Sequence, residues 1–238
     1  MTKQYIELQN LDELGYAQNE AYKSLRTNLT FCGSDIKKVL LTSSVPNEGK
    51  SSVSFQLAKA LAADSNKVLF IDADLRKSVL IGRLGAIRND KKEIKGLSHY
   101  LSGQVEVEEV VYGTNVSGLD IVFSGPVVPS PTELLGNDYM NRLLNSYCTE
   151  YDYVIIDAPP LGSVVDALIL TRYCDGSILV IQNNHISRRL AQNIKKQLEQ
   201  GGCRLLGAVL NKVDMEKNSY YNGYYKGYYK EYYNEYQE

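Results

Sequence analysis

The chain has 238 residues, of which 44% are hydrophobic and 23% are charged, a composition typical of a globular protein with its own core. Its 26 basic and 28 acidic side chains give a formal charge of -2, which argues against a dedicated nucleic-acid binder because such proteins usually carry a basic excess. The 4 cysteines include no C-x-x-C pair, and no apolar run reaches the ~18 residues of a membrane span. We therefore expect reduced thiols, no zinc site and a cytoplasmic chain that reaches the membrane only through a partner.

Short apolar segments alternate with helical ones along most of the chain. A helix is predicted over 19–31, where Ala21, Leu25 and Leu29 share one face. Strands are predicted at 39–43, 68–71, 119–123, 154–156, 178–181 and 205–210, helices at 50–63, 137–148, 163–173 and 187–200, and an exposed loop at 88–95. This alternation predicts an α/β fold with a doubly wound, mostly parallel sheet, helices on both faces, and a ligand at the carboxyl ends of the strands.

The composition changes abruptly at Met215. Residues 216–238 contain no aliphatic side chain, and nine of the 19 tyrosines of the chain lie there. They are Tyr220, Tyr221, Tyr224, Tyr225, Tyr228, Tyr229, Tyr232, Tyr233 and Tyr236. Such a segment buries too little surface to offset the entropy of ordering. We therefore predict one domain over 1–214, with an N-terminal helical segment, and a disordered tail over 215–238.

A phosphate-binding loop lies between the first of these strands and the helix that follows it. It has the sequence S-V-P-N-E-G-K-S over 44–51, with serine where the first glycine is usual. Backbone amides at a helix start bind phosphate, while the lysine reaches the β and γ phosphates and the serine hydroxyl ligates Mg²⁺. The domain is thus expected to be of the P-loop NTPase type. The predicted nucleotide ligands are Ser44, Pro46, Asn47, Glu48, Gly49, Lys50, Ser51 and Ser52, together with Arg76 and Asn211.

Aspartates follow two further strands of the predicted sheet. Asp72 and Asp74 follow the strand at 68–71, and Asp157 follows the strand at 154–156. Carboxylates at this edge face the phosphates, and Mg²⁺ prefers a few carboxylates together with phosphate oxygens and water. We predict Ser51, Asp72 and Asp157 as metal ligands, and Lys50, Asp72 and Asp74 as catalytic residues. The alternative, that the aspartates only cap turns or helices, is disfavoured by the order of the three elements.

These motifs together resemble those of the bacterial tyrosine kinases. The family combines a Walker A loop with an interior proline, a D-x-D-x-R element, a D-x-P-P element and a C-terminal tyrosine cluster, which correspond to Pro46, 72–76, 157–160 and 220–236. The segment 129–135 is also similar to a loop of that family, so the resemblance covers roughly residues 15–238. It implies an ATP- and Mg²⁺-dependent protein-tyrosine kinase that autophosphorylates its tail.

The resemblance also implies partners and a setting. These are a homo-oligomeric ring, a separate transmembrane activator of the polysaccharide co-polymerase type, a cognate protein-tyrosine phosphatase, and a role in capsular or extracellular polysaccharide synthesis at the inner face of the cell membrane. The family's oligomerisation motif corresponds to Glu20, Lys23 and Arg26. Lys23 replaces an arginine and therefore lacks the planar guanidinium fork.

Three other functions fit some of the motifs. The first is a deviant Walker ATPase of septum positioning or plasmid partition. The phosphate loop of these ATPases carries a second lysine at the position where this chain has Val45, and their function gives no reason for a tyrosine-rich tail. A GTPase is suggested by the N-K-x-D sequence at 211–214, although Asn211 can instead contact adenine. A nucleotide-gated adaptor would use the tail only for docking. Transfer of the γ-phosphate to the tail distinguishes a kinase from the adaptor.

The length of the tail bears on how the kinase would act. Residues 215–238 span roughly 25–30 Å as a flexible chain, which suits the crevice of a neighbouring subunit better than their own. We therefore expect phosphorylation between subunits. Each phosphate adds about −1.5 to −2 charges, so extensive phosphorylation is expected to shift an oligomer towards the monomer.

Overall fold

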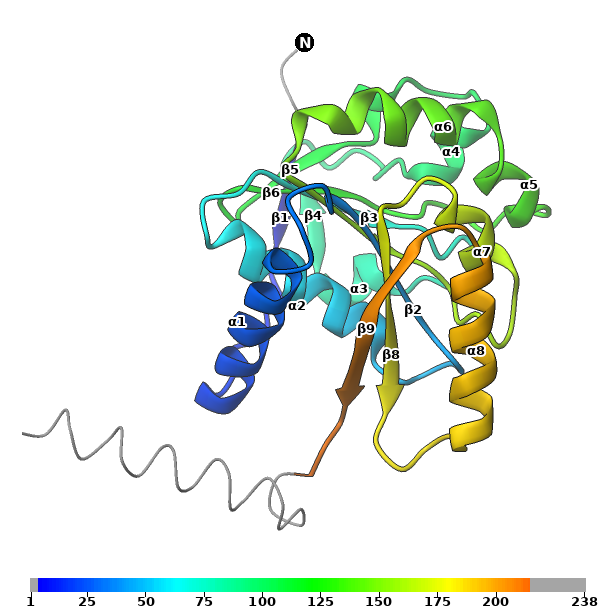
Figure 1. Ribbon diagram of the computed structural model, residues 1–238. Coiled ribbons are helices and arrows are strands. Elements are labelled where there is room, and N and C mark those ends of the chain that lie inside the picture. The colour runs from blue at the N-terminus through cyan, green and yellow to red at the C-terminus, as the bar shows by residue number, and fades with distance from the viewer. Residues whose placement is uncertain (1–3, 215–238) are drawn as a thin grey trace, which may run out of the picture.

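The computed structural model describes residues 4–214, in which 9 strands form one sheet in the order β4-β1-β5-β6-β3-β7-β2-β8-β9 (Figure 1). The strands are β1 (Gln4–Leu8), β2 (Lys38–Ser43), β3 (Val68–Asp72), β4 (Ala86–Arg88), β5 (Tyr112–Thr114), β6 (Leu119–Val122), β7 (Tyr153–Asp157), β8 (Gly176–Gln182) and β9 (Arg204–Asn211). All neighbours from β6 to β9 pair in parallel, whereas β4 with β1 and β5 with β6 are antiparallel. The predicted mostly parallel sheet is confirmed.

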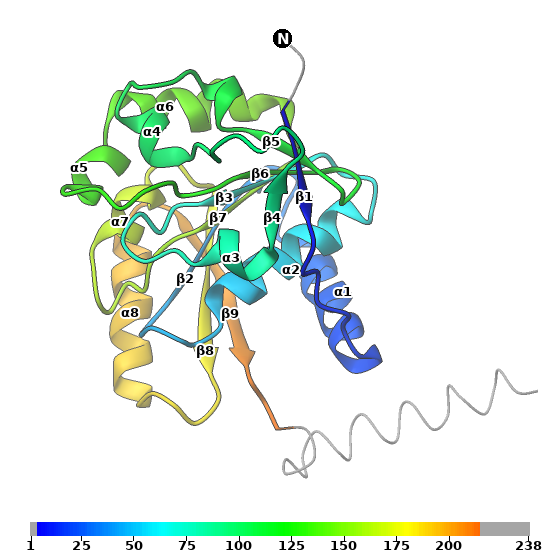
Figure 2. The same ribbon diagram turned by 180° about the vertical axis from the view of Figure 1, so that it is seen from behind.

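Helices cover both faces of this sheet (Figures 1 and 2). They are α1 (Tyr16–Thr30), α2 (Lys50–Ala62), α3 (Leu80–Leu84), α4 (Leu97–Leu101), α5 (Pro131–Leu135), α6 (Asp138–Asn145), α7 (Asp166–Thr171) and α8 (Arg188–Gln200), with short 3-10 turns at Val107–Glu109 and Tyr147–Glu150. Alternate side chains of β3 enter two cores because successive residues of a strand face opposite sides. Leu69 and Ile71 pack with α4 to α8, whereas Val68 and Phe70 pack with α1 to α3. The doubly wound architecture is therefore confirmed.

Several short elements were not predicted. The strands β1, β4 and β5 each have three to five residues, and α3, α4 and α5 have five each, too few for a clear hydrophobic period. The N-terminal segment thus contributes a strand as well as a helix, and the predicted loop 88–95 begins inside β4. The helix predicted over 163–173 starts only at Asp166. The predicted tail 215–238, and hence its boundary with the domain, lies outside the described residues.

Three central strands carry the predicted site to one edge of the sheet. β2 leads into the phosphate loop, while β3 and β7 end at Asp72 and Asp157, which lie directly opposite each other in the parallel register. Gly49 begins α2 with φ 86°, a left-handed conformation in which a Cβ atom would also collide with the side chain of Asn211. Only glycine suits this position. Over residues 4–214, no helix is both long enough and apolar enough to cross a membrane.

Candidate active site

The phosphate loop is fixed from within by Glu48. The carboxylate accepts hydrogen bonds from the backbone N–H groups of Ser44 at 2.7 Å, Val45 at 2.9 Å and Gln182 at 3.0 Å. Glu48 is 0% exposed, and such charge-assisted bonds offset much of the penalty for burying a carboxylate. Although we predicted Glu48 as a nucleotide ligand, its side chain faces the amides of its own loop and the end of β8. Its role here is to shape the loop.

The segment that follows β9 supports the same loop from outside. The Asn211 side-chain amide donates to the carbonyl of Glu48 at 2.8 Å, and Lys212 Nζ donates to the carbonyl of Asn47 at 2.6 Å and to Gln182 Oε1 at 3.1 Å. The N-K-x-D sequence therefore begins with two residues that position the phosphate loop. Lys212 is exposed, and its two hydrogen bonds nevertheless tie it to the phosphate loop and to β8.

A buried ion pair lies under the loop. Lys50 Nζ is 2.7 Å from Asp157 Oδ1 and donates to Ser51 Oγ at 3.2 Å. Ser54, one turn further along α2, donates to the same Asp157 oxygen at 2.9 Å. Lys50 is 6% exposed and Asp157 is 1% exposed. Asp157 thus neutralises the lysine that is expected to meet the phosphates.

Asp72 lies beside this pair at the end of β3 and is 1% exposed. Its carboxylate accepts a short hydrogen bond from the Ser78 hydroxyl and another from the backbone N–H of Asp74 at 3.3 Å. Burial, together with the neighbouring Asp157 carboxylate, raises the pKa of Asp72 to about 7, against the opposing effects of Ser78 and Lys50. A carboxyl group of this pKa can accept a proton near neutral pH.

Asp74 and Arg76 shape the loop that follows Asp72. Asp74 Oδ1 accepts from the backbone N–H groups of Arg76 at 3.2 Å and Lys77 at 3.1 Å, the hydrogen bonds of an Asx turn. The Arg76 guanidinium binds both oxygens of Asp166, at 2.7 and 2.9 Å, and donates to Thr132 at 2.9 Å. The bond to Asp166 raises the pKa of Arg76.

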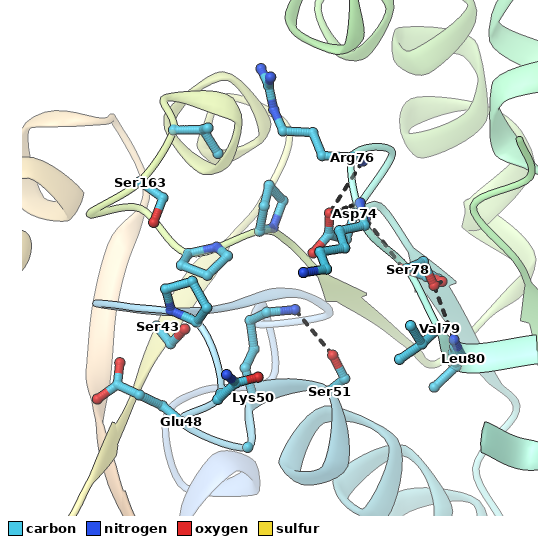
Figure 3. A pocket seen from close by; sticks show the side chains of 18 of the residues that line it. Ser43, Glu48, Lys50, Ser51, Asp74, Arg76, Ser78, Val79, Leu80 and Ser163 are labelled. Atoms are coloured by element: carbon cyan, nitrogen blue, oxygen red, sulfur yellow. Dashed lines mark hydrogen bonds between the residues drawn. The ribbon is translucent and has the colours of Figure 1, made fainter. Parts of the chain in front are cut away.

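These contacts give Arg76 a partner that the sequence did not indicate. The sequence left two partners open, a phosphate or the Asp74 side chain, but the guanidinium forms its ion pair with the fully buried Asp166 at the start of α7. Figure 3 shows the Arg76 side chain extending away from Lys50 and Ser51. The residue thus connects the loop after β3 to α5 and α7. Because Arg76 also lines the cavity beside the phosphate loop, its contact with the nucleotide stays a prediction.

Replacing Asp166 with asparagine tests this connection. We expect a loss of about 2–4 kcal/mol in the free energy of unfolding, because the buried partner of a bidentate ion pair is removed. Arg76 is 38% exposed and recovers part of its hydration, so the loss stays below the upper end for fully buried pairs. Urea denaturation measures the change, with Asp138→Asn, on the surface of α6, as the control. A change as small as that of the control would contradict the connection.

A cavity of about 380 Å³ lies at this edge of the sheet (Figure 3). Of the predicted site residues it is lined by Pro46, Asn47, Glu48, Gly49, Lys50, Ser51, Asp72, Asp74 and Arg76. Ser44, Asp157 and Asn211 do not line it, and Ser52 borders a smaller neighbouring cavity. The sequence did not predict four residues that support the site, because none of them belongs to a motif. They are Ser54, Ser78, Thr132 and Asp166.

The donor set suits a magnesium ion. One hydroxyl, from Ser51, and two buried carboxylates, from Asp72 and Asp157, converge beside the phosphate loop. Mg²⁺ characteristically takes one or two protein carboxylates and completes its octahedron with phosphate oxygens and water. The residues present therefore fit the ion that the sequence predicted.

The predicted oligomerisation residues make contacts within their own chain. Lys23 pairs with Glu20 at 2.7 Å on the surface of α1, and Arg26 donates to the Ala60 carbonyl at 3.3 Å and lies 3.6 Å from Asp64. A role for these side chains between subunits stays a prediction.

The fold and the site define a P-loop nucleotide-binding domain, and comparison with known proteins narrows the class. The family model described as an AAA domain matches residues 44–201. Tyrosine-protein kinase CpsD of Streptococcus agalactiae is 43% identical over 201 residues, which cover 84% of this chain and 85% of that protein. The kinase domain of Escherichia coli tyrosine kinase ETK superposes with a TM-score of 0.76 at 36% identity, covering 82% of this chain and 75% of the other. The chain belongs to the bacterial tyrosine kinases.

The septum-positioning ATPases are more distant. The septum site-determining protein MinD of Pyrococcus horikoshii, solved with Mg-ADP, has a TM-score of 0.64 at 24% identity, covering 76% of this chain and 72% of the other. At this identity the likeness concerns the fold alone. The resemblance to the tyrosine kinases, which rested on four motifs in the sequence, is thus confirmed.

Proposed function

We propose that the chain transfers the γ-phosphate of ATP to the tyrosines of its own C-terminal segment. The observation that carries this proposal is that Lys50 and Asp72 line one cavity with the phosphate loop, while the buried Asp157 pairs with Lys50 behind it. Phosphoryl transfer depends mainly on positioning and on neutralising charge, and this cavity combines a cation, an anion-binding loop and a carboxylate able to accept a proton.

Each residue has a distinct part in the proposed reaction. The loop amides and Lys50 bind the β and γ phosphates and stabilise the charge of the transferring group. Asp72 orients the acceptor phenol and accepts its proton, a modest task because a phenol ionises near pH ~10. Asp74 keeps Asp72 in place through the turn that it caps. Ser51, Asp72 and Asp157 would hold Mg²⁺, which would neutralise charge on the phosphates.

Transfer of a labelled γ-phosphate to tyrosine tests the proposal. The full chain is expected to label itself, and a variant with phenylalanine at all nine tail tyrosines is expected to bind ATP without becoming labelled. Phosphoamino-acid analysis identifies the acceptor. A chain that binds ATP and never labels its tyrosines would instead support the adaptor or the ATPase switch.

We also propose that transfer takes place between subunits of a homo-oligomer. In a mixture of the phenylalanine variant, which keeps an intact active site, and Lys50→Met, which keeps its tyrosines, only the Lys50→Met chain is expected to be labelled. Strictly intramolecular transfer would leave both chains unlabelled.

Phosphorylation is expected to weaken this oligomer. Nine phosphates would add on the order of −13 to −18 charges near the subunit contacts, and the repulsion would favour the monomer. Sedimentation should therefore show a smaller particle for ATP-treated wild type than for Lys50→Met. Identical sedimentation of the two over a range of protein concentrations would disprove the charge switch.

The family membership supports a wider setting for this activity. We propose that the kinase regulates capsular or extracellular polysaccharide synthesis and that a transmembrane protein of the polysaccharide co-polymerase type activates it at the inner face of the cell membrane. A cognate phosphatase would reset the tail.

A further inference from the structure

The wall of the cavity beyond Asp72 is built by the end of its loop and the start of α3. Lys77, Val79, Leu80 and Arg83 line it there. Val79 is 69% exposed, an unusual state for a β-branched apolar side chain that borders a cavity. Lys77 and Arg83 are exposed as well. The site described above uses none of these side chains.

The two cations at this wall are not engaged in ion pairs. Within residues 4–214 neither Lys77 nor Arg83 forms an ion pair. Asp12 shares a smaller neighbouring cavity with Arg83, and Asp74 accepts a hydrogen bond from the backbone N–H of Lys77, but neither carboxylate forms an ion pair with these cations in the described residues. Arg76, the adjacent cation of the loop, is by contrast bound to Asp166. Two positive charges outside any ion pair therefore flank an apolar side chain at the mouth of the cavity.

The chemistry of transfer places the acceptor on this side. The attacking oxygen and the leaving oxygen lie roughly in line across the transferring phosphoryl group. Because the phosphate loop binds the nucleotide side, the acceptor approaches from the side of Asp72. The cavity wall available there consists of the loop after β3 with α3 and, facing it, Pro159 and Pro160. A phenol ring entering here meets Val79 and the prolines, which suit its apolar faces.

The acceptor segment carries negative charge that the two cations can meet. Residues 215–238 contain four glutamates and three lysines, and eight of their nine tyrosines stand in doublets. In a doublet the second tyrosine is only about 3.8 Å along the chain from the first. A phosphate on one member, with its charge of about −1.5 to −2, thus enters the region of Lys77 and Arg83 when the other member enters the cavity.

We propose that Lys77, Val79 and Arg83 form an acceptor subsite that selects tyrosines next to an anionic group. Val79 contacts the phenol ring, and the two cations bind the neighbouring charge. This proposal rests on the proposed kinase function and adds an order in which the tyrosines are phosphorylated. A first phosphate speeds the addition of the second to the same doublet, so tails become heavily phosphorylated one chain at a time.

Trans-phosphorylation of a full-length acceptor tests the subsite. Lys50→Met serves as the acceptor, and the enzyme is the chain with nine tail phenylalanines, with or without the further pair Lys77→Ala and Arg83→Ala. Intact-mass spectrometry at early times gives the number of phosphates per acceptor chain. The matched control enzyme carries Arg188→Ala and Arg189→Ala, two exposed arginines of α8.

The unaltered enzyme is expected to add the second phosphate about fivefold faster than the first, the effect of roughly one exposed ion pair. The Lys77/Arg83 double variant should bring this ratio close to one, while the α8 control preserves it. An acceptor with its four tail glutamates replaced by glutamine shows whether the negative charge that binds the subsite comes from glutamate or from phosphate. A slower first step with that acceptor shows that glutamate also binds the subsite, and an unchanged first step assigns the effect to phosphate.

Two results would overturn the subsite in different ways. A ratio that is the same in the double variant and in the unaltered enzyme would disprove the role of the two cations and leave the kinase function standing. Failure of the full wild-type chain to label its own tyrosines with labelled ATP would disprove the kinase function, and the subsite with it. A Val79→Ala enzyme adds a separate measurement, since the proposal predicts a higher KM for the acceptor with kcat little changed.

Discussion

Replacing Lys50 with methionine is expected to lower the rate of phosphoryl transfer by at least about 10³-fold, because a single preorganised donor at developing charge is commonly worth 10²–10³-fold and Lys50 carries a full charge. Within the described chain it is the cation paired with the buried carboxylates of the site. Methionine preserves the length of the side chain and removes the charge. Initial rates with labelled ATP measure the effect.

The same substitution is expected to change stability less than activity. Asp157 loses its ion pair but keeps the hydrogen bond from Ser54 at 2.9 Å. We therefore expect a loss of about 2–4 kcal/mol in the free energy of unfolding, somewhat below the range for breaking a buried pair outright. Lys59→Met, on the same helix, is the control. A Lys50→Met rate within about tenfold of wild type would remove Lys50 from the proposed mechanism.

The residues of the site that could be predicted from the sequence lie in contiguous motifs. The phosphate loop, the element containing Asp72 and the element containing Asp157 each combine a buried strand with polar residues at its end, and parallel strands bring such ends together. Sequence order alone then indicates that they meet. The register confirms that Asp72 and Asp157 lie directly opposite each other.

The supporting contacts could not be predicted in this way. Arg76 and Asp166 are 90 positions apart, and Glu48 bonds to Gln182 across 134 positions. Asp166 and Gln182 belong to no periodic pattern in the sequence. They meet Arg76 and Glu48 only because α7 and β8 pack against the central strands. The short strands β1, β4 and β5 could not be predicted for the same reason. A segment of three to five residues forms a strand only when neighbours distant in sequence supply the hydrogen bonds.

Replacing Asp72 with asparagine is expected to abolish most activity and to stabilise the ligand-free protein. The amide cannot accept a proton from the phenol, and loss of a general base typically lowers a rate by about 10²–10⁴-fold. In the folded chain the pKa of Asp72 is about 7, compared with 3.8 for a free side chain. Folding thus favours the protonated form, which asparagine resembles in size and neutrality.

The sign of the pH dependence follows from linkage. A carboxyl group whose folded pKa is raised contributes fully to stability below the unfolded pKa, and this contribution is lost as the pH rises through the folded value. For Asp72 the loss begins near pH 4 and is complete above pH 7, where the gap between the two pKa values corresponds to as much as about 4 kcal/mol. The amide has one acceptor oxygen where the carboxylate offers two to Ser78 and Asp74, so a gain on the order of 2–3 kcal/mol at pH 8 is expected for Asp72→Asn.

Urea denaturation of the nucleotide-free protein in EDTA, at pH values from 4 to 8, measures this difference. The two proteins should have nearly equal stability at pH 4 and diverge as the pH rises, with the variant the more stable. Asp35→Asn, at an exposed position before β2, should follow the wild type throughout. Parallel stability curves for Asp72→Asn and wild type would mean that the pKa of Asp72 is the same in the folded and the unfolded chain. The carboxylate would then be a poor proton acceptor, and its part in the reaction would be limited to holding the metal ion and orienting the acceptor.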